Sequence, residues 1–281
     1  MELEERAKGR AKELISNSEK TTLIVFSHPN HELAIFGILQ RLRPHLLYLT
    51  DGGGRERVAE TKRGLGRIGL LEQATFLNHS EATFYESLVA GDNSFFGQVT
   101  AQVSAVVGLL KPAQVLCDAV EFYNPIHDLS LPIVRAAIPS RENTPVLEVP
   151  LVHQKNLASE EYEVQRLPGS RQAEQIEMRL TEEELDQKLF ARETIYLSLA
   201  DQMGPLLSEL PRAHTGLEVV APARSAVPEP TTDQILRYEW RAELLRSRGE
   251  FSTPITYSDH YLPIASELFC ANVPASELVT R

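Results

Sequence analysis

Short apolar runs alternate with helix-like stretches along the first half of the chain. Runs of four or five apolar residues bounded by polar ones favour buried strands, and periodic apolar positions favour helices. Strands are predicted over residues 22–26, 46–50, 74–77, 114–117 and 146–149. Helices are predicted between them, over residues 31–42, 55–68, 95–110 and 129–138. This alternation predicts right-handed βαβ units and a mostly parallel sheet with helices on both faces.

The second half of the chain changes to amphipathic helical patterns. Thr181 and Glu184 have the spacing of a capping box, in which each side chain pairs with the backbone of the other. A long helix is predicted from there towards Leu210, with a bend near residues 204–205. Further helices are predicted over Glu2–Ile15 and over residues 231–248 and 257–269.

These patterns together predict a Rossmann-like three-layer α/β/α fold with extra C-terminal helices. Three prolines within residues 222–230 indicate a loop rather than a domain boundary. We therefore expect one domain over residues 1–281, with a core at about 20–153 and a helical C-terminal extension at about 170–281.

Charge and length narrow the classes of partner. The chain has 281 residues and a formal net charge of −11, whereas proteins that bind phosphate backbones usually carry a basic excess. No nucleic acid is therefore expected, and an anionic membrane surface is disfavoured for the same reason. No apolar run approaches the ~20 residues that span a bilayer, and Met1–Glu5 lacks the basic start of a secretion signal. We expect a cytoplasmic protein with a small-molecule partner, and the sequence leaves a homo-oligomer open.

Histidines gather where the predicted strands end. The two cysteines are too few for a disulfide framework or a thiolate metal site, so any metal must bind histidines and carboxylates. Ligands of open parallel sheets bind at the carboxyl ends of the strands. Five histidines lie at or close after predicted strand ends, namely His28, His31, His79, His127 and His153. They are therefore predicted to share one rim of the sheet.

The first pair has the spacing of metal ligands. His28 and His31 stand three residues apart at a predicted helix start, so both rings can face one ion. His127, from another strand end, would complete three imidazoles and leave a position for water, as in catalytic zinc sites. The alternative is that His28 caps the helix while His31 is a solvated surface residue.

Three glycines follow the second predicted strand. Gly52–Gly54 could cradle an anion at a helix start, which keeps nucleotide binding open as an alternative. The segment lacks the spacing of dinucleotide-binding and P-loop motifs, and a tight turn explains it equally well. Asp51 beside it could hydrogen-bond a ligand histidine, contact a substrate, or cap the next helix.

Several motifs together resemble one family. His28-Pro-Asn-His-Glu after the first strand, Thr50-Asp-Gly after the second, Arg57-x-x-Glu60 on a helix, and Asn124-Pro-Ile-His127 after the fourth strand carry the resemblance. They resemble the LmbE-like (PIG-L) de-N-acetylases, over roughly residues 22–200. The resemblance implies a zinc-dependent hydrolase that removes an N-acyl group, such as acetyl, from an amino sugar or glycoside conjugate.

The family motifs are His-Pro-Asp-Asp-Glu and His-Pro-Asp-His. By position, the resemblance makes His28 and His127 zinc ligands, with His31 in place of the Asp ligand. Asn30 stands at the position of the general base, and Asn124 at that of the histidine that stabilises or protonates the intermediate.

These two amides raise the question of where the base lies. An amide does not accept a proton from water at neutral pH, although Asn124 can still donate a hydrogen bond to an oxyanion. Another carboxylate could serve, and Glu121 is the preferred candidate over Asp118 and Asp51, although a solvated loop position also explains it. The zinc site could instead act with little base assistance, or the chain could bind metal or sugar without catalysis.

Two more residues are assigned to substrate binding. Arg57 matches a substrate-contacting arginine of the family, although a helical salt bridge to Glu60 would also explain it. Tyr123 is expected to line the pocket, or else to pack inside the protein.

Overall fold

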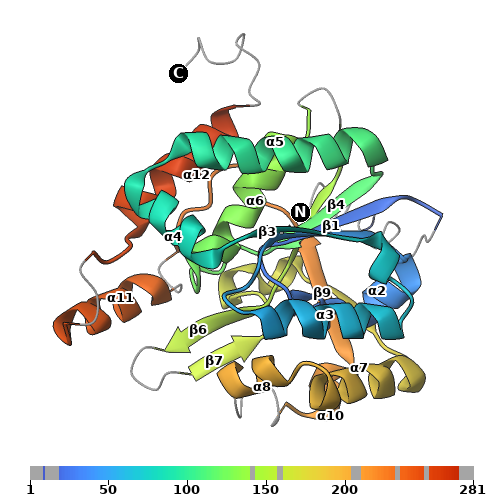
Figure 1. The fold of residues 1–281 in the computed structure, drawn as a ribbon. Coiled ribbons are helices and arrows are strands. Elements are labelled where there is room, and N and C mark those ends of the chain that lie inside the picture. Colours follow the sequence, from blue (N-terminus) through green and yellow to red (C-terminus); the bar gives the residue numbers. More distant parts are fainter. Residues whose placement is uncertain are drawn as a thin grey trace.

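A seven-stranded sheet forms the centre of the protein (Figure 1). The computed structural model describes residues 19–139, 143–156, 161–203, 210–231, 235–249 and 253–271, together with Gly9. Its strands are β1 (Thr22–Phe26), β2 (His45–Thr50), β3 (Ala74–His79), β4 (Gln114–Asp118), β5 (Val146–Val149), β8 (Ile176–Arg179) and β9 (Leu217–Pro222). Their order is β3-β2-β1-β4-β5-β9-β8. The pairs among the first five strands are parallel, whereas β9 runs antiparallel to β5 and to β8.

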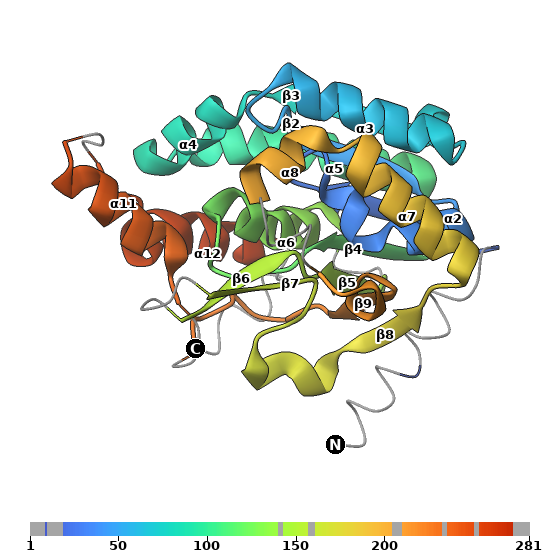
Figure 2. The same cartoon turned by 90° about the horizontal axis from the view of Figure 1, so that it is seen from below.

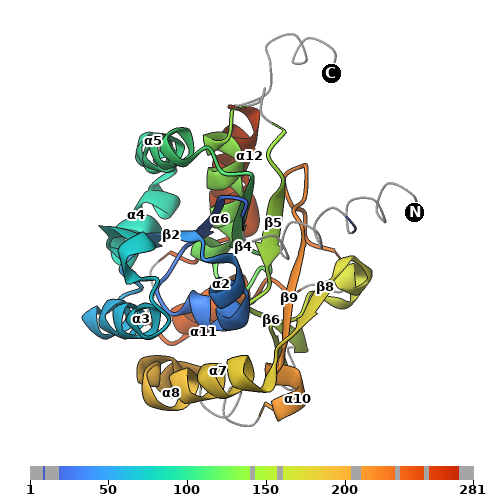
Figure 3. The ribbon, with the colours of Figure 1, turned by 90° about the vertical axis from the view of Figure 1, so that its right-hand side faces the viewer.

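Helices cover both faces of the sheet. One face carries the 3₁₀ turn His31–Ile35, α2 (Phe36–Leu42), α3 (Arg55–Arg67) and α7 (Glu182–Thr194). The other carries α4 (Glu81–Ala90), α5 (Asn93–Leu110), α6 (Pro125–Ala137) and α12 (Leu262–Cys270). Figure 3 shows α5 and α12 in one layer and α7 in the other. The three-layer α/β/α fold is therefore confirmed.

The central strands are buried on both sides. Ile24 and Phe26 of β1 pack into the core under α2 and α3, while Leu23 and Val25 pack into the core under α5 and α6. This near-continuous burial is what a parallel sheet between two helical layers requires. It explains why β1, β2 and β4 appear in the sequence as nearly continuous apolar runs.

The first half follows the predicted order, with shifted boundaries. All five predicted strands are present, and β5 has the predicted bounds. The predicted helix over residues 31–42 begins as a 3₁₀ turn, and α6 starts earlier than predicted because Asn124 caps it. Helix α4 was not predicted, although its first residue, Glu81, lines the cavity described below.

The second half is less helical than predicted. Strands β8 and β9 extend the main sheet, and β6 (Val152–Asn156) pairs with β7 (Glu161–Val164) as a separate antiparallel hairpin. The helical extension predicted from about residue 170 therefore also contains two strands of the main sheet. These strands have only four to six residues each, and charged residues interrupt their apolar patterns.

The capping box of α7 is confirmed, but the long helix is not. The Thr181 hydroxyl accepts the Glu184 N–H, and the Glu184 carboxylate accepts the Thr181 N–H. The helix ends at Thr194, and α8 (Leu197–Met203) follows as a separate element. The predicted bend at residues 204–205 and nearly all of the helix predicted over Glu2–Ile15 lie outside the described residues.

The remaining helical elements follow β9 or join strands. They are the turns Leu71–Gln73 and Gly169–Glu174, the short α10 (Arg212–Thr215), α11 (Arg237–Ser247), and a π-helical turn, Tyr257–Tyr261, that leads into α12. Figure 2, seen from below, shows α11 reaching away from the sheet beside α12. Within the described ranges, no helix is long and apolar enough to cross a membrane.

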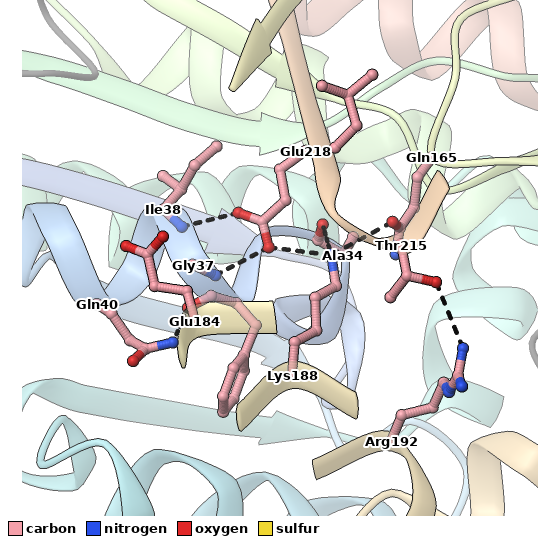
Figure 4. A network of polar contacts seen from close by, with 12 residues as sticks. Ala34, Gly37, Ile38, Gln40, Gln165, Glu184, Lys188, Arg192, Thr215 and Glu218 are labelled. Atoms are coloured by element: carbon pink, nitrogen blue, oxygen red, sulfur yellow. Dashed lines mark hydrogen bonds and ion pairs between the residues drawn. The ribbon is translucent and has the colours of Figure 1, made fainter. Parts of the chain in front are cut away.

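A buried ion pair ties the second half to the first (Figure 4). The Glu218 carboxylate on β9 accepts the Gly37 and Ile38 N–H groups of α2, each at 2.8 Å. The Lys188 ammonium on α7 lies 2.9 Å from the same carboxylate and donates to the Ala34 carbonyl at 2.9 Å. Burial lowers the pKa of Lys188, and the charge of Glu218 opposes that shift. The pair therefore fixes α2, α7 and β9 to one another.

Candidate active site

A cavity of about 330 Å³ lies at the carboxyl ends of β1, β2 and β4. Part of its wall is polar and part is apolar. The polar side chains that line it are His28, Asn30, His31, Arg57, Glu81, Tyr123, Asn124, His127 and Gln165. The apolar ones are Leu33, Ala34, Leu151, Val152, Val164, Leu199 and Met203. The position agrees with the general location of ligand sites in open parallel sheets.

Three of the five rim histidines meet in this cavity. The ring centroids of His28 and His31 are 5.2 Å apart, those of His28 and His127 are 4.9 Å apart, and those of His31 and His127 are 4.5 Å apart. His28 lies in the loop after β1, His31 begins the 3₁₀ turn that follows it, and His127 lies in the first turn of α6 after β4. The parallel pairing of β1 with β4 brings these segments side by side. The predicted convergence of His28, His31 and His127 is thus what the fold produces.

Hydrogen bonds fix which nitrogen of His28 carries a proton. The Thr50 hydroxyl donates to the Ser27 carbonyl at 2.8 Å and lies 2.6 Å from His28 Nδ1. Because that hydroxyl has only one proton, it must accept from His28, so Nδ1 is protonated. The lone pair of His28 is therefore on Nε2, which is buried without a hydrogen-bond partner.

Asp118 orients His31 in the same way. One carboxylate oxygen lies 3.1 Å from His31 Nδ1, and the other accepts the Ser27 N–H and hydroxyl at 2.7 and 2.6 Å. A carboxylate can only accept from the ring, so Nδ1 is protonated and Nε2 carries the lone pair. Metal-bound histidines are commonly oriented by such a carboxylate. The sequence suggests Asp51 as the carboxylate that hydrogen-bonds a ligand histidine, but in the structure Asp118 makes this bond.

Burial favours the neutral form of two of these histidines, His28 and His127. Burial lowers the pKa of His28 well below its usual value, and the neighbouring His127, His31 and Arg57 lower it further. Burial likewise lowers the pKa of His127, with His31 and Arg57 adding to the effect. Neutral imidazole is the form that binds metal ions.

The three imidazoles fit zinc in their chemistry and ring spacing, but not in the orientation of their rings. His28 Nε2 and His127 Nδ1 are buried without hydrogen-bond partners. Imidazoles on one tetrahedral zinc, at ~2.1 Å from the ion, have centroids ~5 Å apart, close to the observed spacings. The ring orientations differ from that arrangement, since the rings meet edge to face. As they stand, no three or more His, Cys, Asp or Glu side chains in the described residues are arranged to hold a metal ion. Binding would therefore require the rings to turn.

Asn30 lines the cavity, but its side-chain amide is hydrogen-bonded to other residues of the protein. The backbone there is left-handed, with φ of 81°. The amide nitrogen donates to Glu60 at 2.9 Å and to Ser198 at 3.2 Å, and the amide oxygen accepts from the Thr61 hydroxyl at 3.0 Å. These bonds tie the loop after β1 to α3 and α8.

Asn124 lines the opposite side and caps α6. Its side-chain oxygen accepts the Ile126 N–H at 2.9 Å and the Tyr85 hydroxyl at 3.3 Å. Tyr123 lines the cavity next to it, with the Arg237 guanidinium 4.8 Å from its ring centroid.

Arg57 is a buried cation in the wall. It donates from Nη1 to the Gly52 carbonyl at 3.0 Å, while Nε has no hydrogen-bond partner. Burial lowers its pKa, and the charges of Glu81, Glu32 and Glu60 oppose that shift. The helical salt bridge to Glu60 that the sequence also suggested is absent from the ion pairs of the described residues.

Two predicted site residues do not line the cavity. The Glu121 carboxylate is buried and accepts the N–H groups of Leu151 and Val152 at 2.9–3.1 Å. Burial raises its pKa well above the usual value. Asp51 accepts the N–H groups of Gly53 and Glu81 at 2.9 and 3.0 Å. The predictions that Glu121 faces the pocket and that Asp51 contacts a substrate there are therefore wrong in their placement, because both carboxylates hold backbone loops.

His79 and His153 also lie away from the cavity wall. His79 Nε2 is 2.7 Å from the Gln102 side-chain oxygen, and His153 Nε2 is 3.5 Å from the Glu163 carboxylate on the neighbouring strand. Neither residue is a cavity-lining group.

Sequence inspection missed Glu81. It stands in the first turn of α4, and its carboxylate lies 3.8 Å from His28 Nε2. Burial raises its pKa, and the charge of Arg57 opposes the rise. The available signal was Ser80, whose hydroxyl accepts the Thr83 N–H at 3.0 Å and so caps a helix directly after β3.

The glycine turn accommodates side chains rather than an anion. Gly52 and Gly53 are left-handed, with φ of 69° and 76°. A Cβ on Gly52 would lie 3.2 Å from the Arg57 Cδ, and a Cβ on Gly53 would collide with the Glu81 carboxylate. The tight-turn interpretation therefore explains the glycines, and the N–H groups of Gly52 and Gly53 already donate to Thr50 and Asp51.

Comparisons with known proteins give distant structural similarities. No family model matches the chain, and no curated protein matches it. A deacetylase triple mutant (Orf2*T) of teicoplanin biosynthesis is similar at 16% identity and a TM-score of 0.46, covering 72% of this chain and 97% of that one. The A40926 pseudoaglycone deacetylase Dbv21 is similar at 13% identity and a TM-score of 0.48, covering 72% and 96%. The zinc-inhibited form of teicoplanin deacetylase Orf2 is similar at 13% identity and a TM-score of 0.46, covering 73% and 100%.

Proposed function

We propose that this chain is a zinc-dependent hydrolase that removes an N-acyl group, such as acetyl, from an amino sugar or glycoside conjugate. The observation that carries the proposal is the meeting of His28, His31 and His127 in one cavity, with Arg57 in the same wall. The motifs that contain these residues are those that resemble the de-N-acetylase family.

Each residue has a specific task in this proposal. His28 and His31 would hold zinc through Nε2, the nitrogen that their hydrogen bonds leave unprotonated, and His127 would be the third ligand. When bound, zinc supplies Lewis acidity that polarises the acyl carbonyl and makes water a stronger nucleophile near neutral pH. Arg57 presents a cation to a sugar hydroxyl or acyl oxygen, and Tyr123 offers an aromatic face. The amide of Asn124 donates to the oxyanion as it develops.

Metal content and turnover test the proposal together. We expect purified protein to contain one zinc per chain, and a His28→Ala/His127→Ala variant to lose it while remaining folded by circular dichroism. His79→Ala, outside the cavity, is the matched control and should keep the metal. Wild-type protein should deacetylate at least one member of a panel of N-acetylglucosamine conjugates. Absence of zinc from wild-type protein, or no turnover across the panel, would contradict the proposal.

A second candidate function is metal or sugar binding without catalysis. It is favoured by the fact that Asn30 and Asn124 occupy the family's base and acid positions, with the Asn30 amide fully engaged by Glu60, Ser198 and Thr61. In that case a sugar conjugate would stabilise the protein in thermal shift without being turned over. Activity that appears only in Asn30→Asp would support this alternative.

A further inference from the structure

We propose that Glu81 is the catalytic base that accepts a proton from the water attacking the acyl carbon. This assignment rests on the proposed N-deacylase function and supplies the proton acceptor that Asn30 cannot provide. Among the described residues that line the cavity, Glu81 is the single carboxylate.

Four other carboxylates near the cavity already hold hydrogen bonds inside the protein. Asp118 holds Ser27 and His31, and Asp51 holds the backbone of the glycine turn. Glu60 accepts from the Asn30 amide and from the Ser198 N–H and hydroxyl. Glu121 accepts two backbone N–H groups. Each of these would have to abandon internal hydrogen bonds in order to serve as a base.

Glu81 borders the space in front of the central histidine. Its Oε1 lies 3.8 Å from His28 Nε2, the donor atom assigned to the metal. At that distance the two atoms do not form a direct hydrogen bond, so the carboxylate borders the space in front of Nε2 without closing it. A general base needs to be within hydrogen-bond reach of the water it activates, and this position allows it.

The local backbone is arranged so that this carboxylate can approach. One Asp51 oxygen accepts the N–H groups of both Gly53 and Glu81, which joins the turn after β2 to the start of α4. Gly53 leaves room for the carboxylate, since any Cβ there would overlap it. Asp51 and Gly53 are therefore positioning residues for Glu81, and the glycine turn acquires a purpose in the site.

The proposed reaction needs only the substrate, one water molecule and the Glu81 carboxylate. The water oxygen bonds to the acyl carbon, one water O–H bond breaks, and its proton passes to a Glu81 oxygen while the carbonyl π pair moves onto the acyl oxygen. The acyl oxygen then returns its electron pair to re-form the carbonyl, the carbon–nitrogen bond breaks with its pair on nitrogen, and nitrogen takes the proton from Glu81. The products are the free amine and the carboxylic acid, and Glu81 returns to the carboxylate.

The test compares Glu81→Gln, Glu81→Asp and the control Glu86→Gln, an exposed glutamate on the same helix. General base catalysis is worth roughly 10²–10⁴-fold, so kcat of Glu81→Gln should fall at least about 100-fold. Its KM, zinc content and melting temperature should stay near those of wild type. Glu81→Asp, which keeps a carboxylate, should retain more activity than Glu81→Gln, and Glu86→Gln should match wild type.

Each contrary result overturns a specific statement. If Glu81→Gln stays folded and keeps kcat within threefold of wild type, Glu81 is not the base. If it loses zinc along with activity, or if Glu81→Asp is no better, Glu81 holds the metal or the fold rather than a proton. If wild-type protein turns over no N-acyl amino sugar, the proposed function fails first and this assignment fails with it.

Discussion

Single hydrogen bonds decide the chemical state of the histidines. Thr50 accepts a hydrogen bond from Nδ1–H of His28, and Asp118 accepts one from Nδ1–H of His31. In the neutral rings, this leaves the lone pair on Nε2. The sequence indicated the histidines by their spacing, but their tautomers depend on partners 22 and 87 residues away along the chain. Such partners cannot be predicted from local pattern.

Asp118 provides a direct test of this arrangement. Asp118→Asn offers one acceptor oxygen where the carboxylate offers two, so either Ser27 or His31 loses its partner. We expect a loss of about 1–3 kcal/mol in unfolding free energy, the usual penalty for an unsatisfied buried group. Zinc affinity, measured by chelator competition, should fall roughly 10–100-fold. Asp186→Asn, exposed on α7, should change neither quantity.

Gly53 should be far less tolerant than its neighbour. Gly53→Ala places a Cβ against the Glu81 carboxylate at a left-handed φ of 76°, and Ala is disfavoured there. We expect a loss of more than about 1 kcal/mol in stability and a large fall in kcat. Gly54→Ala is the matched control, because Gly54 is extended at φ −170° and accepts any residue. Equal activity of the two variants would contradict the positioning role of Gly53.

At the scale of elements, most of the strands that could be predicted from the sequence are buried along nearly their whole length. Strands β1, β2, β4 and β5 are buried along nearly their whole length, and their apolar runs were sufficient to find them. Strand β9 is equally buried, but only Val219–Ala221 are apolar between Glu218 and Pro222, and so short a run does not indicate a strand. The charge is acceptable only because Lys188 and two α2 amides meet it inside the fold.

Breaking that pair should destabilise the protein strongly. Lys188→Met leaves the Glu218 carboxylate buried without its cation, so we expect a loss of about 3–5 kcal/mol in unfolding free energy by urea titration. Arg212→Met removes a cation from an exposed pair with Glu182 and should leave the unfolding free energy nearly unchanged. Similar losses in the two variants would show that the buried pair does not hold β9 and α7 to α2.

In the candidate site, too, some residues could be located from the sequence and others could not. Residues directly after predicted strands, such as His28 and His127, were found because a parallel sheet brings strand ends together. Glu121 was misplaced because the backbone N–H groups of Leu151 and Val152 attract its carboxylate inwards, away from the cavity. Glu81 was missed because α4 has a weak amphipathic pattern and was not predicted as an element.

At the scale of the whole molecule, the cavity joins two halves of the chain. Apart from Gln165, its polar wall comes from residues 28–127, whereas most of its apolar wall comes from the β6–β7 hairpin region and α8. Figure 1 shows α8 beside the hairpin. The sequence could not indicate this wall, because Leu151, Val164 and Leu199 meet only after β9 and α7 have docked on the sheet. A cavity with one polar and one apolar wall fits a sugar that carries an apolar substituent.

Substrates with a longer alkyl group should therefore bind more tightly. Each buried CH₂ contributes about 0.8 kcal/mol, so two on the apolar wall should lower KM roughly tenfold. Comparing acetyl with hexanoyl as the N-acyl group, and methyl with hexyl as the aglycone, shows which end of the substrate meets that wall. Leu199→Asp should abolish the advantage of the hexyl or hexanoyl compound, because it places a charge in the wall. Leu197→Asp, exposed on the same helix, should preserve it. If KM is independent of chain length at both positions, the apolar wall packs only against the protein itself, and the substrate occupies the histidine side alone.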